Sequence, residues 1–424
     1  MRNPAAPPHE PPYHQGVPVE IRAIEESELP RWIAALQVPF FVAEGDPGQQ
    51  AALRRAQYDL ARCRGAFDGH TLCGTFRSFP TELTVPGPQF VTASAITAVT
   101  VLPTHRRQGL LRRMMAADLQ ASVERGEALS ILIASEYPIY GRFGFARAAD
   151  HVGLSVDASS ARFTHRGGGT VELVDRDVLR NVGPGLYERV RHAQVGSITR
   201  NDFWWDTTLG IVDAGWPPPK GIRYVLHRDG RGEPQGYLSY HVDEKWEDRV
   251  SETTLVVHEL LACTDDAYVR LWRYACEVDW VATVKAEDRS IDEALPWLLE
   301  DARAVRQQHR TDFLFVRVLD PVTALSARRY LSAGRTVLDV RDEDGYATRR
   351  VALETDGSTA SCRETRESPD VTLDVRALGA AYLGGTTLAT LAAAGLVAES
   401  SPGGIARADA LLGWNADPWC STWF

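Results

Sequence analysis

The sequence predicts a protein of the α/β and α+β classes, with two mixed-sheet domains followed by a third, α+β domain. Three observations support this expectation. The 424 residues are too many for one hydrophobic core and suggest about two to four domains. The order of elements β-α-α-β-β-β-α-β is followed by a similar order with a single helix after its first strand. From Phe313 the pattern changes to strands and a small-residue helix.

The first copy of this pattern precedes residue 135. Apolar periodicity, β-branched runs and one turn signal predict a strand at Val19–Arg22, helices at Glu26–Leu36 and Pro47–Ala61, a hairpin turning at Asp68-Gly69, and a strand at Gln89–Val101. An amphipathic helix from Leu110 to Val123 follows, and Gly126 is expected to end it. The apolar run Leu129–Ala134 then predicts a strand that is buried on both faces.

The second copy follows a glycine stretch at residues 167–169. The same signals predict a strand at Val171–Val174, a helix at Arg176–Ala193, a hairpin turning at Asp229-Gly230, a strand at Leu255–Ala262, a helix at Ala267–Glu277 and a strand at Trp280–Lys285. Sequence identity between the two copies is low. The duplication is therefore an inference from the pattern alone.

The remainder of the chain predicts the α+β domain. Its expected elements are strands at Phe313–Val318 and Thr336–Val340, a turn at Asp344-Gly345 and one helix at Ala377–Ala394. The last residues are aromatic and apolar, so we expect the end of the chain to be packed. The predicted boundaries are a disordered leader at 1–17 and domains at 18–153, 154–310 and 311–424.

Composition excludes several classes of protein. No run approaches the roughly 18 consecutive apolar residues of a membrane span, and the first residues lack the apolar core of a secretory signal. The six cysteines show no CxxC pair and no metal-ligand spacing, so neither a metal site nor a disulfide framework is expected. The formal charge of −10 argues against general nucleic-acid affinity. We expect a cytoplasmic protein.

One loop combines features of an anion site. A strand ending at Val101 leads into Arg106-Arg107-Gln108-Gly109-Leu110-Leu111, where a helix is expected to begin. The first turn of a helix presents unpaired N–H groups and the positive end of its dipole, and a glycine allows a diphosphate to approach closely. Arg112 adds positive charge. The arginines could instead form a nucleic-acid patch, but the acidic chain and the lack of interleaved aromatic residues oppose that reading.

The same loop resembles the acetyl-CoA motif of the GNAT superfamily, because Arg106-x-x-Gly109-x-Leu111 follows a Val-x-Val strand. Leu111 departs from the usual glycine or alanine at that position. The stretches Val101–Arg112 and Ser135–Phe145 are similar to the Eis (enhanced intracellular survival) family of GNAT enzymes. The resemblance implies two GNAT-like domains followed by a sterol-carrier-protein-like domain, to which the residues 370–385 would belong.

The resemblance also implies the roles of individual residues. Acetyl-CoA would be the cosubstrate, without a metal, and its contacts would be Val99, Thr100, Val101, Arg106, Arg107, Gln108, Gly109, Leu110, Leu111, Arg112, Ser135 and Glu136. The strand 95–99 has no carboxylate, so the base must come from elsewhere, and the family points to the terminal carboxylate of Phe424. Tyr140 would be the general acid. The structural alternatives are a Phe424 that fills an apolar gap, a Tyr140 satisfied in the core, and a helix cap at Ser135 and Glu136.

The resemblance implies a hexamer that acetylates primary amines, such as aminoglycosides, lysine side chains or polyamines, in a ternary complex. The second domain is expected to be inactive, because no glycine opens the equivalent loop and Asp265 and Asp266 would repel a diphosphate. Two alternatives remain open. The third domain could carry an apolar ligand, with the GNAT-like domains as a scaffold, or the enzyme could use a bulkier acyl-CoA.

Overall fold

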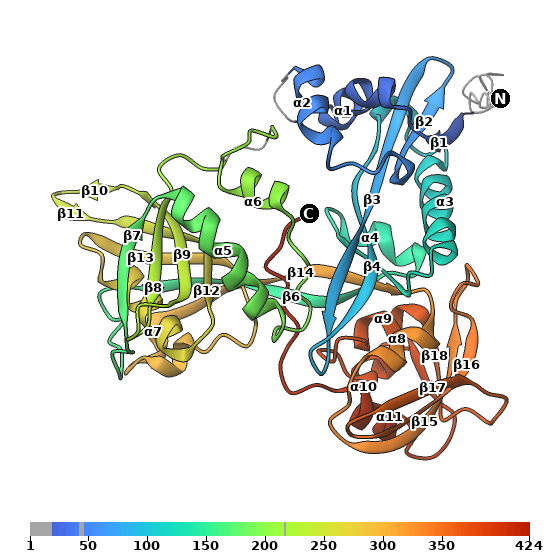
Figure 1. Ribbon diagram of the computed structural model, residues 1–424. Helices are drawn as coiled ribbons and strands as arrows, with labels where there is room; N and C mark the ends of the chain where they lie inside the picture. The colour runs from blue at the N-terminus through green and yellow to red at the C-terminus, as the bar shows by residue number, and fades with distance from the viewer. Residues whose placement is uncertain (1–18, 42–45, 216–217) are drawn as a thin grey trace, which may run out of the picture. The chain divides into compact units, whose positions relative to one another are not determined.

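The computed structural model describes residues 19–41, 46–215 and 218–424, so the leader expected at 1–17 lies outside the described residues. The chain divides into two compact units. The first unit contains the residues up to Arg77 together with Ala98–Met114, and the second contains Ser78–Thr97 and Met115–Phe424. Figure 1 labels the elements of both.

The first unit contains the beginning of the first pattern copy. Its elements are β1 (Glu20–Ala23), α1 (Leu29–Gln37), α2 (Pro47–Arg55), β2 (Cys63–Asp68), the start of β3 (Thr71–Val85), the end of β4 (Gln89–Val101) and the start of α3 (Leu110–Glu124). The Asp68-Gly69 hairpin is confirmed, because β2 and β3 pair as antiparallel neighbours. The helix predicted at Pro47–Ala61 is too long. It stops at Arg55, because Asp59 caps a separate 3-10 turn by accepting from the N–H of Ala61.

The core of the first unit lies under α1. Trp32 has no exposed surface, and its indole N–H donates to the carbonyl of Arg64 on β2 at 2.8 Å. Ile33, Leu36 and Phe67 pack in the same cluster. This packing fixes α1 to the sheet because an aromatic side chain buries a large apolar area while its polar atom remains paired.

The second copy lies wholly within the second unit. It consists of β7 (Thr170–Val174), α5 (Arg176–Arg191), α6 (Asp202–Thr208), β8 (Arg223–Arg228), β9 (Pro234–Asp243), β12 (Thr253–Ala262), α7 (Asp265–Glu277) and β13 (Val281–Arg289), with the two-residue strands β10 (Trp246–Glu247) and β11 (Val250–Ser251) after β9. The element order repeats that of the first copy, which confirms the predicted duplication of the pattern. In both copies the strand before the third helix runs parallel to the strand after it.

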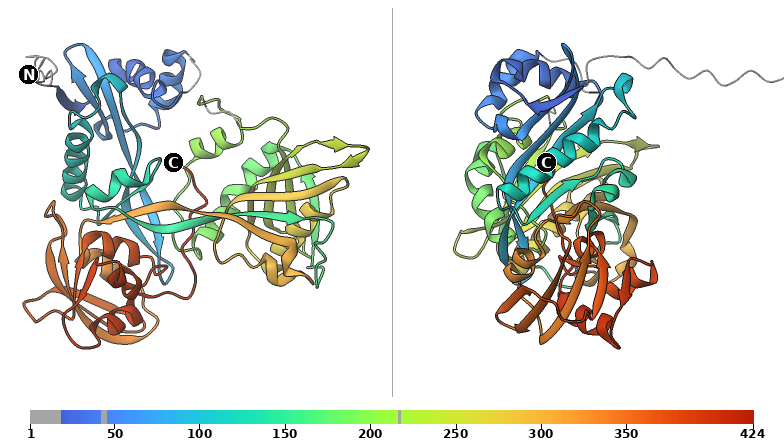
Figure 2. Two further views of the ribbon diagram at one scale, coloured as in Figure 1. Left: turned by 180° about the vertical axis from the view of Figure 1, so that it is seen from behind. Right: turned by 90° about the vertical axis from the view of Figure 1, so that its right-hand side faces the viewer.

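Two layers of helices cover the sheet of the second copy. Tyr224 and Leu226 on β8 share a core with residues of α5, whereas the intervening Val225 shares a core with residues of α7. Successive side chains of a strand point to opposite faces, so α5 and α7 lie on opposite sides of the sheet. The views in Figure 2 agree with this arrangement.

The strand predicted at Phe313–Val318 is present, but its assignment to the third domain's sheet is wrong. It is the end of β14 (Val305–Val318), which lies between β5 (Leu129–Ile133) and β6 (Ala146–Asp157) in the second unit. All six residues from Phe313 to Val318 are buried. The apolar run therefore identified a central strand, but it carried no information about the neighbours with which that strand pairs.

The third domain has a five-stranded sheet in the order β17-β16-β15-β18-β19. Its elements are α8 (Pro321–Ala327), β15 (Ala333–Arg341), β16 (Arg349–Asp356), β17 (Ala360–Glu364), β18 (Val371–Asp374), α9 (Val375–Ala381), α10 (Leu388–Ala393), β19 (Val397–Glu399) and α11 (Gly404–Leu412). The single helix predicted at Ala377–Ala394 is wrong. It is split into α9 and α10, because Gly384 adopts a left-handed φ of 89° where the chain passes close to Trp414.

A glycine brings α9 close to β14. A Cβ atom on Gly379 would lie 2.5 Å from the carbonyl oxygen of Val316. The small residues of this helix therefore permit a close approach of backbone to backbone. Gly345 has a φ of 85°, which confirms the turn predicted between β15 and β16.

A buried ion pair joins β14 to that turn. The side chain of Arg317 is fully buried, and it donates to both carboxylate oxygens of Asp342 at 3.1 Å. Arg317 also donates to the carbonyl of Phe143 at 2.5 Å. One guanidinium thus connects the third domain to the chain that follows β5.

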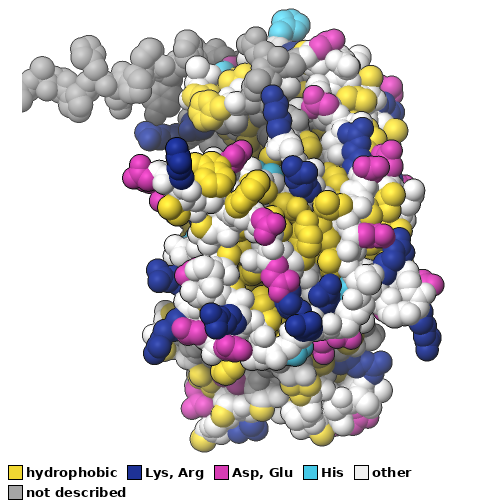
Figure 3. All heavy atoms as spheres, turned by 90° about the vertical axis from the view of Figure 1, so that its left-hand side faces the viewer, with side chains coloured by type: hydrophobic (Ala, Val, Ile, Leu, Met, Phe, Trp, Pro, Cys, Tyr) yellow, Lys and Arg dark blue, Asp and Glu magenta, His cyan; other side chains and the backbone are white. Residues whose placement is uncertain are grey.

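The surface carries both signs of charge. Figure 3 shows acidic and basic side chains interspersed around a hydrophobic area on the face that it draws. No helix in the described part of the chain has the length and the apolar composition that a bilayer crossing requires.

Replacement of Asp342 by Asn should lower the melting temperature by several degrees. The substitution leaves the buried Arg317 without its full countercharge, and breaking a buried ion pair costs about 3–5 kcal/mol. Asp344→Asn is the matched control, because Asp344 lies 3.5 Å from the same guanidinium with 36% of its side chain exposed. Differential scanning calorimetry should show a much smaller shift for the control, and equal shifts would contradict the role of Asp342.

Candidate functional site

The predicted loop forms an open cradle at the start of α3 in the first unit. The chain makes a 3-10 turn at Pro103–His105 and reaches Leu110, where α3 begins. Arg107 and Gly109 have left-handed φ values of 65° and 74°. The first bond of the helix runs from the N–H of Arg113 to the carbonyl of Gly109 at 3.1 Å. The N–H groups before Arg113 therefore have no partner within the helix.

Positive charge surrounds these N–H groups. The side chains of Arg106, Arg107 and Arg112 are exposed, and none of them forms an ion pair with a residue that the structure describes. A Cβ atom on Gly109 would meet no atom within 4 Å, so the space above the glycine is open. Exposed guanidinium groups and unpaired N–H donors at a helix N-terminus suit a phosphate group.

The strand that leads into the loop contains a residue in the left-handed conformation. Ala98 has a φ of 54°, and its carbonyl accepts a hydrogen bond from the hydroxyl of Thr75 at 2.8 Å. The same hydroxyl lies 2.7 Å from that of Thr100. Pairing of β4 with β5 covers Ala93–Ile96, whereas β4 itself continues to Val101. The left-handed residue therefore lies between the part of β4 that pairs with β5 and Val99.

Tyr140 lies in the second unit, in the turn that follows β5. Ser135 and Glu136 are exposed, and the carboxylate of Glu136 does not cap α4 (Tyr137–Tyr140). Tyr140 is 6% exposed, and its hydroxyl forms no hydrogen bond with any described residue. Burial and the nearby charge of Glu136 raise the pKa of Tyr140 to about 12. The phenol is therefore a protonated, unoccupied donor at neutral pH.

The end of the chain is packed, as the sequence predicts. Cys420 and Thr422 are buried, although the adjacent Trp423 is 57% exposed. The half-buried ring of Phe424 meets the edge of Phe79, with ring centroids 5.8 Å apart. The terminal carboxylate of Phe424 forms no ion pair with any residue that the structure describes.

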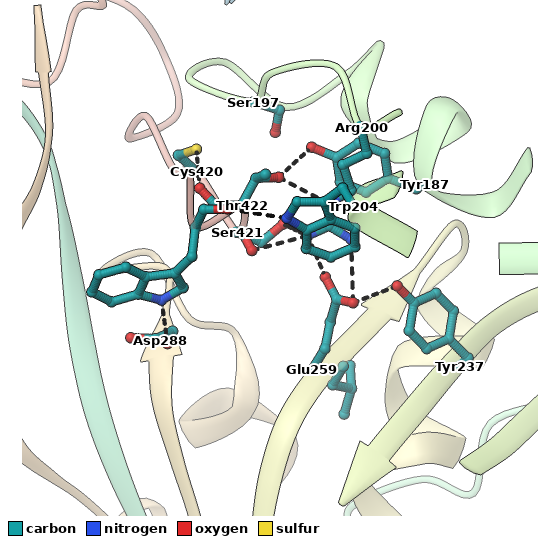
Figure 4. Close-up of polar contacts among 12 residues, drawn as sticks. Tyr187, Ser197, Arg200, Trp204, Tyr237, Glu259, Asp288, Cys420, Ser421 and Thr422 are labelled. Atoms are coloured by element: carbon teal, nitrogen blue, oxygen red, sulfur yellow. Dashed lines mark hydrogen bonds and ion pairs between the residues drawn. The ribbon is translucent and has the colours of Figure 1, made fainter. Parts of the chain in front are cut away.

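Arg200 holds the residues just before this terminus (Figure 4). Its side chain is fully buried and pairs with Glu259 on β12 at 2.8 Å. It also donates to the carbonyl of Ser421 and to the hydroxyl of Thr422, each at 2.9 Å. Burial lowers the pKa of Arg200, but the interactions with Glu259, Tyr187 and Tyr237 together outweigh that effect, and the net pKa is raised. The guanidinium is therefore positively charged, and its N–H groups donate hydrogen bonds to these acceptors.

The structure groups the predicted site residues in three places. The first place is the end of β4 with the loop, which holds Val99, Thr100, Val101, Arg106, Arg107, Gln108, Gly109, Leu110, Leu111 and Arg112. Ser135, Glu136 and Tyr140 follow β5, and Phe424 comes from the opposite end of the sequence. Among the described residues, no hydrogen bond or ring contact joins Phe424 to Tyr140.

Sequence reasoning missed Arg200, Glu259 and Thr422. Arg200 is one of 46 basic residues and belongs to no motif, and Glu259 lies in an otherwise ordinary strand. The one available signal was the aromatic end of the chain, which predicted packing without naming its partners. Contacts between residues 222 positions apart leave no local pattern.

In the second copy, groups of the chain itself lie at the corresponding connection from strand to helix, at the start of α7. The hydroxyl of Thr264 accepts from the N–H of Ala267 at the start of α7. The carboxylate of Asp266 accepts from the N–H of Gly168 at 2.7 Å. The chain's own groups thus cap this helix, and they place negative charge where the first copy has arginines.

Comparisons with known proteins identify three domains, of which the first two are of the same kind. Residues 20–148 match an acetyltransferase (GNAT) domain, residues 196–318 match a second acetyltransferase (GNAT) domain, and residues 321–421 match a sterol carrier protein domain. The chain is 40% identical over 412 residues to an uncharacterized N-acetyltransferase of Streptomyces avermitilis, which covers 96% of this chain and 99% of that protein. It is 34% identical over 339 residues to the N-acetyltransferase Eis of Mycobacterium tuberculosis, which covers 78% of this chain and 80% of that protein.

Solved structures show the same architecture. Eis1 from Mycobacterium abscessus matches with a TM-score of 0.84 and 31% identity, over 96% of this chain and 100% of that one. A GCN5-related N-acetyltransferase from Anabaena variabilis shares the fold, with a TM-score of 0.82 at 18% identity over 96% of this chain and 100% of that one. The chain therefore belongs to the Eis family of GNAT N-acetyltransferases, with two GNAT domains followed by a C-terminal sterol carrier protein domain.

Proposed function

We propose that this enzyme transfers the acetyl group of acetyl-CoA to a primary amine by direct attack within a ternary complex. The observation that carries the proposal is the cradle at the start of α3. It combines Gly109 in a left-handed conformation, unpaired N–H groups, and three arginines without ion-pair partners among the described residues. Such a site fits the diphosphate of coenzyme A because backbone dipoles and guanidinium groups both favour negative charge.

Different residues around the cradle would bind different parts of acetyl-CoA. Residues 106–112 would hold the diphosphate, and Val99, Thr100 and Val101 would offer main-chain groups to the peptide-like arm of the cosubstrate. The N–H of Val101 would also stabilise negative charge on the thioester oxygen. Ser135 and Glu136 are exposed after β5, and by family resemblance they would contact the same arm. The occupied junction at Thr264 and Asp266 supports one acetyl-CoA per chain.

Two groups of the second unit would move the protons. The carboxylate of Phe424 would take a proton from the attacking amine, either directly or through a water molecule. Support for this role comes from the anchored terminus and from the lack of an ion pair at the carboxylate within the described residues. Tyr140 would donate a proton to the departing thiolate, because its raised pKa keeps the phenol protonated.

The proposed acceptor is a cationic small molecule or a lysine side chain, in keeping with the family. Aminoglycosides and polyamines are the two small-molecule classes to screen first, by the release of free coenzyme A thiol. We also propose a homo-oligomer, a hexamer by family resemblance, with no nucleic-acid partner.

Gly109→Ala should raise the Kd for acetyl-CoA by about tenfold. A left-handed conformation costs an alanine about 1–2 kcal/mol, so the loop is expected to shift and misplace its N–H donors. Gly126→Ala is the matched control, because Gly126 has a φ of 75° and a Cβ there also meets no atom within 4 Å. Isothermal titration calorimetry should find the Kd of the control unchanged. Similar affinities in the two variants would argue against the cradle.

Adding two residues after Phe424 should lower kcat by about 100-fold or more, because the extension moves the carboxylate away from its position. The Kd for acetyl-CoA should stay unchanged. The same two residues added at the N-terminus provide the control. Full turnover in the C-terminally extended enzyme would remove the carboxylate from the mechanism.

Tyr140→Phe should lower kcat by about 100-fold, because the general acid is lost. With a pKa of about 12, the phenol is the protonated donor at neutral pH and stays so until the pH nears that value. The wild-type enzyme should therefore show no fall in kcat from loss of this proton between about pH 8 and pH 10. Tyr137→Phe is the control, since Tyr137 lies in the same turn and is 57% exposed. Equal rates for the two variants would exclude Tyr140.

A further inference from the structure

The guanidinium of Arg200 is the centre of a buried network that reaches the end of the chain. It lies 3.8 Å from the ring centroids of both Tyr187 and Trp204, so its two faces are covered by aromatic rings. Its edge is occupied by Glu259, by the carbonyl of Ser421 and by the hydroxyl of Thr422. No part of the side chain is exposed to solvent.

Glu259 balances this charge from the second GNAT domain. Its carboxylate accepts from Arg200 through both oxygens, at 2.8 and 3.3 Å, and from the hydroxyl of Tyr237 at 2.5 Å. Glu259 follows an irregularity in the pairing of β12 with β9. The irregularity interrupts the regular alternation of the strand just before Glu259.

The donors and acceptors around Thr422 can be assigned in only one way. The hydroxyl of Tyr187 donates its one proton to the carbonyl of Ile198 at 2.6 Å. In the 2.8 Å contact between Tyr187 and Thr422, the threonine must therefore be the donor. Thr422 also accepts from the Nε of Arg200 at 2.9 Å. The Thr422 hydroxyl therefore both donates and accepts a hydrogen bond. Together these bonds fix the rotamer of Thr422 and the backbone that carries it.

Further bonds restrain the neighbouring residues of the terminus. His151 donates to the carbonyl of Cys420 at 2.8 Å, and the indole of Trp204 donates to the carbonyl of Trp423 at 3.0 Å. The indole of Trp423 donates to Asp288 at 3.1 Å. Only Phe424 lies beyond these anchors, and its own ring contacts Phe79.

We propose that Arg200, Glu259 and Thr422 are positioning residues that fix the Phe424 carboxylate for catalysis. The inference rests on the proposed role of that carboxylate as the base. It assigns a task to the second GNAT domain, whose own helix junction is capped: that domain orders the end of the chain. A misplacement of a catalytic group by about 1 Å can lower the rate about 100-fold, so loss of the anchoring should lower kcat.

Thr422→Val tests the proposal, because valine keeps the shape of threonine and removes only the hydroxyl. Thr422→Ser restores the hydroxyl and is the rescue control. Two quantities are measured in each variant: kcat with the Kd for acetyl-CoA, and the rate at which a carboxypeptidase releases Phe424, followed by mass spectrometry of the intact chain. The second readout reports the order of the terminus without any need for catalysis.

We expect Thr422→Val to lose Phe424 about tenfold faster than the wild type and to lose about 10- to 100-fold in kcat, with an unchanged Kd. Thr422→Ser should behave as the wild type in both assays. If the valine variant folds poorly by its melting temperature, Tyr187→Phe removes the acceptor of the Thr422 hydroxyl and should act in the same direction.

The remaining outcomes separate the two proposals. Unchanged release of Phe424 and unchanged kcat in Thr422→Val would overturn the anchoring and leave the carboxylate's role to the extension experiment. Faster release with unchanged kcat would overturn the role of the carboxylate as base, and with it the positioning role. Equal losses in the serine and valine variants would also overturn the positioning role, because the hydroxyl would then be irrelevant.

Discussion

The burial of Arg200 is the constraint on which the end of the chain depends. A buried guanidinium is tolerated only when a countercharge and further acceptors surround it. Here the countercharge comes from β12 and the other acceptors from Ser421 and Thr422, so the second GNAT domain and the terminus complete one another. Neither part by itself provides all the hydrogen-bond acceptors of Arg200. The requirement for complete pairing is what makes the position of the last residues specific.

A second buried arginine performs a similar task elsewhere. Arg317 on β14 pairs with Asp342 of the third domain and donates to the carbonyl of Phe143, close to Tyr140. A Cβ on Gly144, the residue after Phe143, would lie 1.4 Å from this guanidinium, so a larger residue there would displace the arginine. The turn that carries Tyr140 is thus tied to a strand and to a domain that come much later in the sequence.

The two GNAT domains share an order of elements but differ where the third helix begins. In the first, Gly109 and exposed arginines leave the N–H groups of α3 available to an anion. In the second, Thr264 caps the corresponding helix, and the carboxylate of Asp266, which accepts from the N–H of Gly168, adds negative charge there. The same helix terminus can therefore serve as a ligand site or as an ordinary cap, and a few side chains decide which.

Local signals in the sequence determined the order of elements from β1 to β5, the bounds of β4, the start of α3 and the Asp68-Gly69 hairpin, because periodicity and turn chemistry act over a few residues. Family resemblance supplied the roles proposed for Tyr140 and Phe424. Only the tertiary structure placed β14 between β5 and β6, divided the helix at Gly384, and joined Arg200 to Glu259 and Thr422. These features depend on pairings between distant segments, and buried charges find their partners in space without leaving a pattern along the chain.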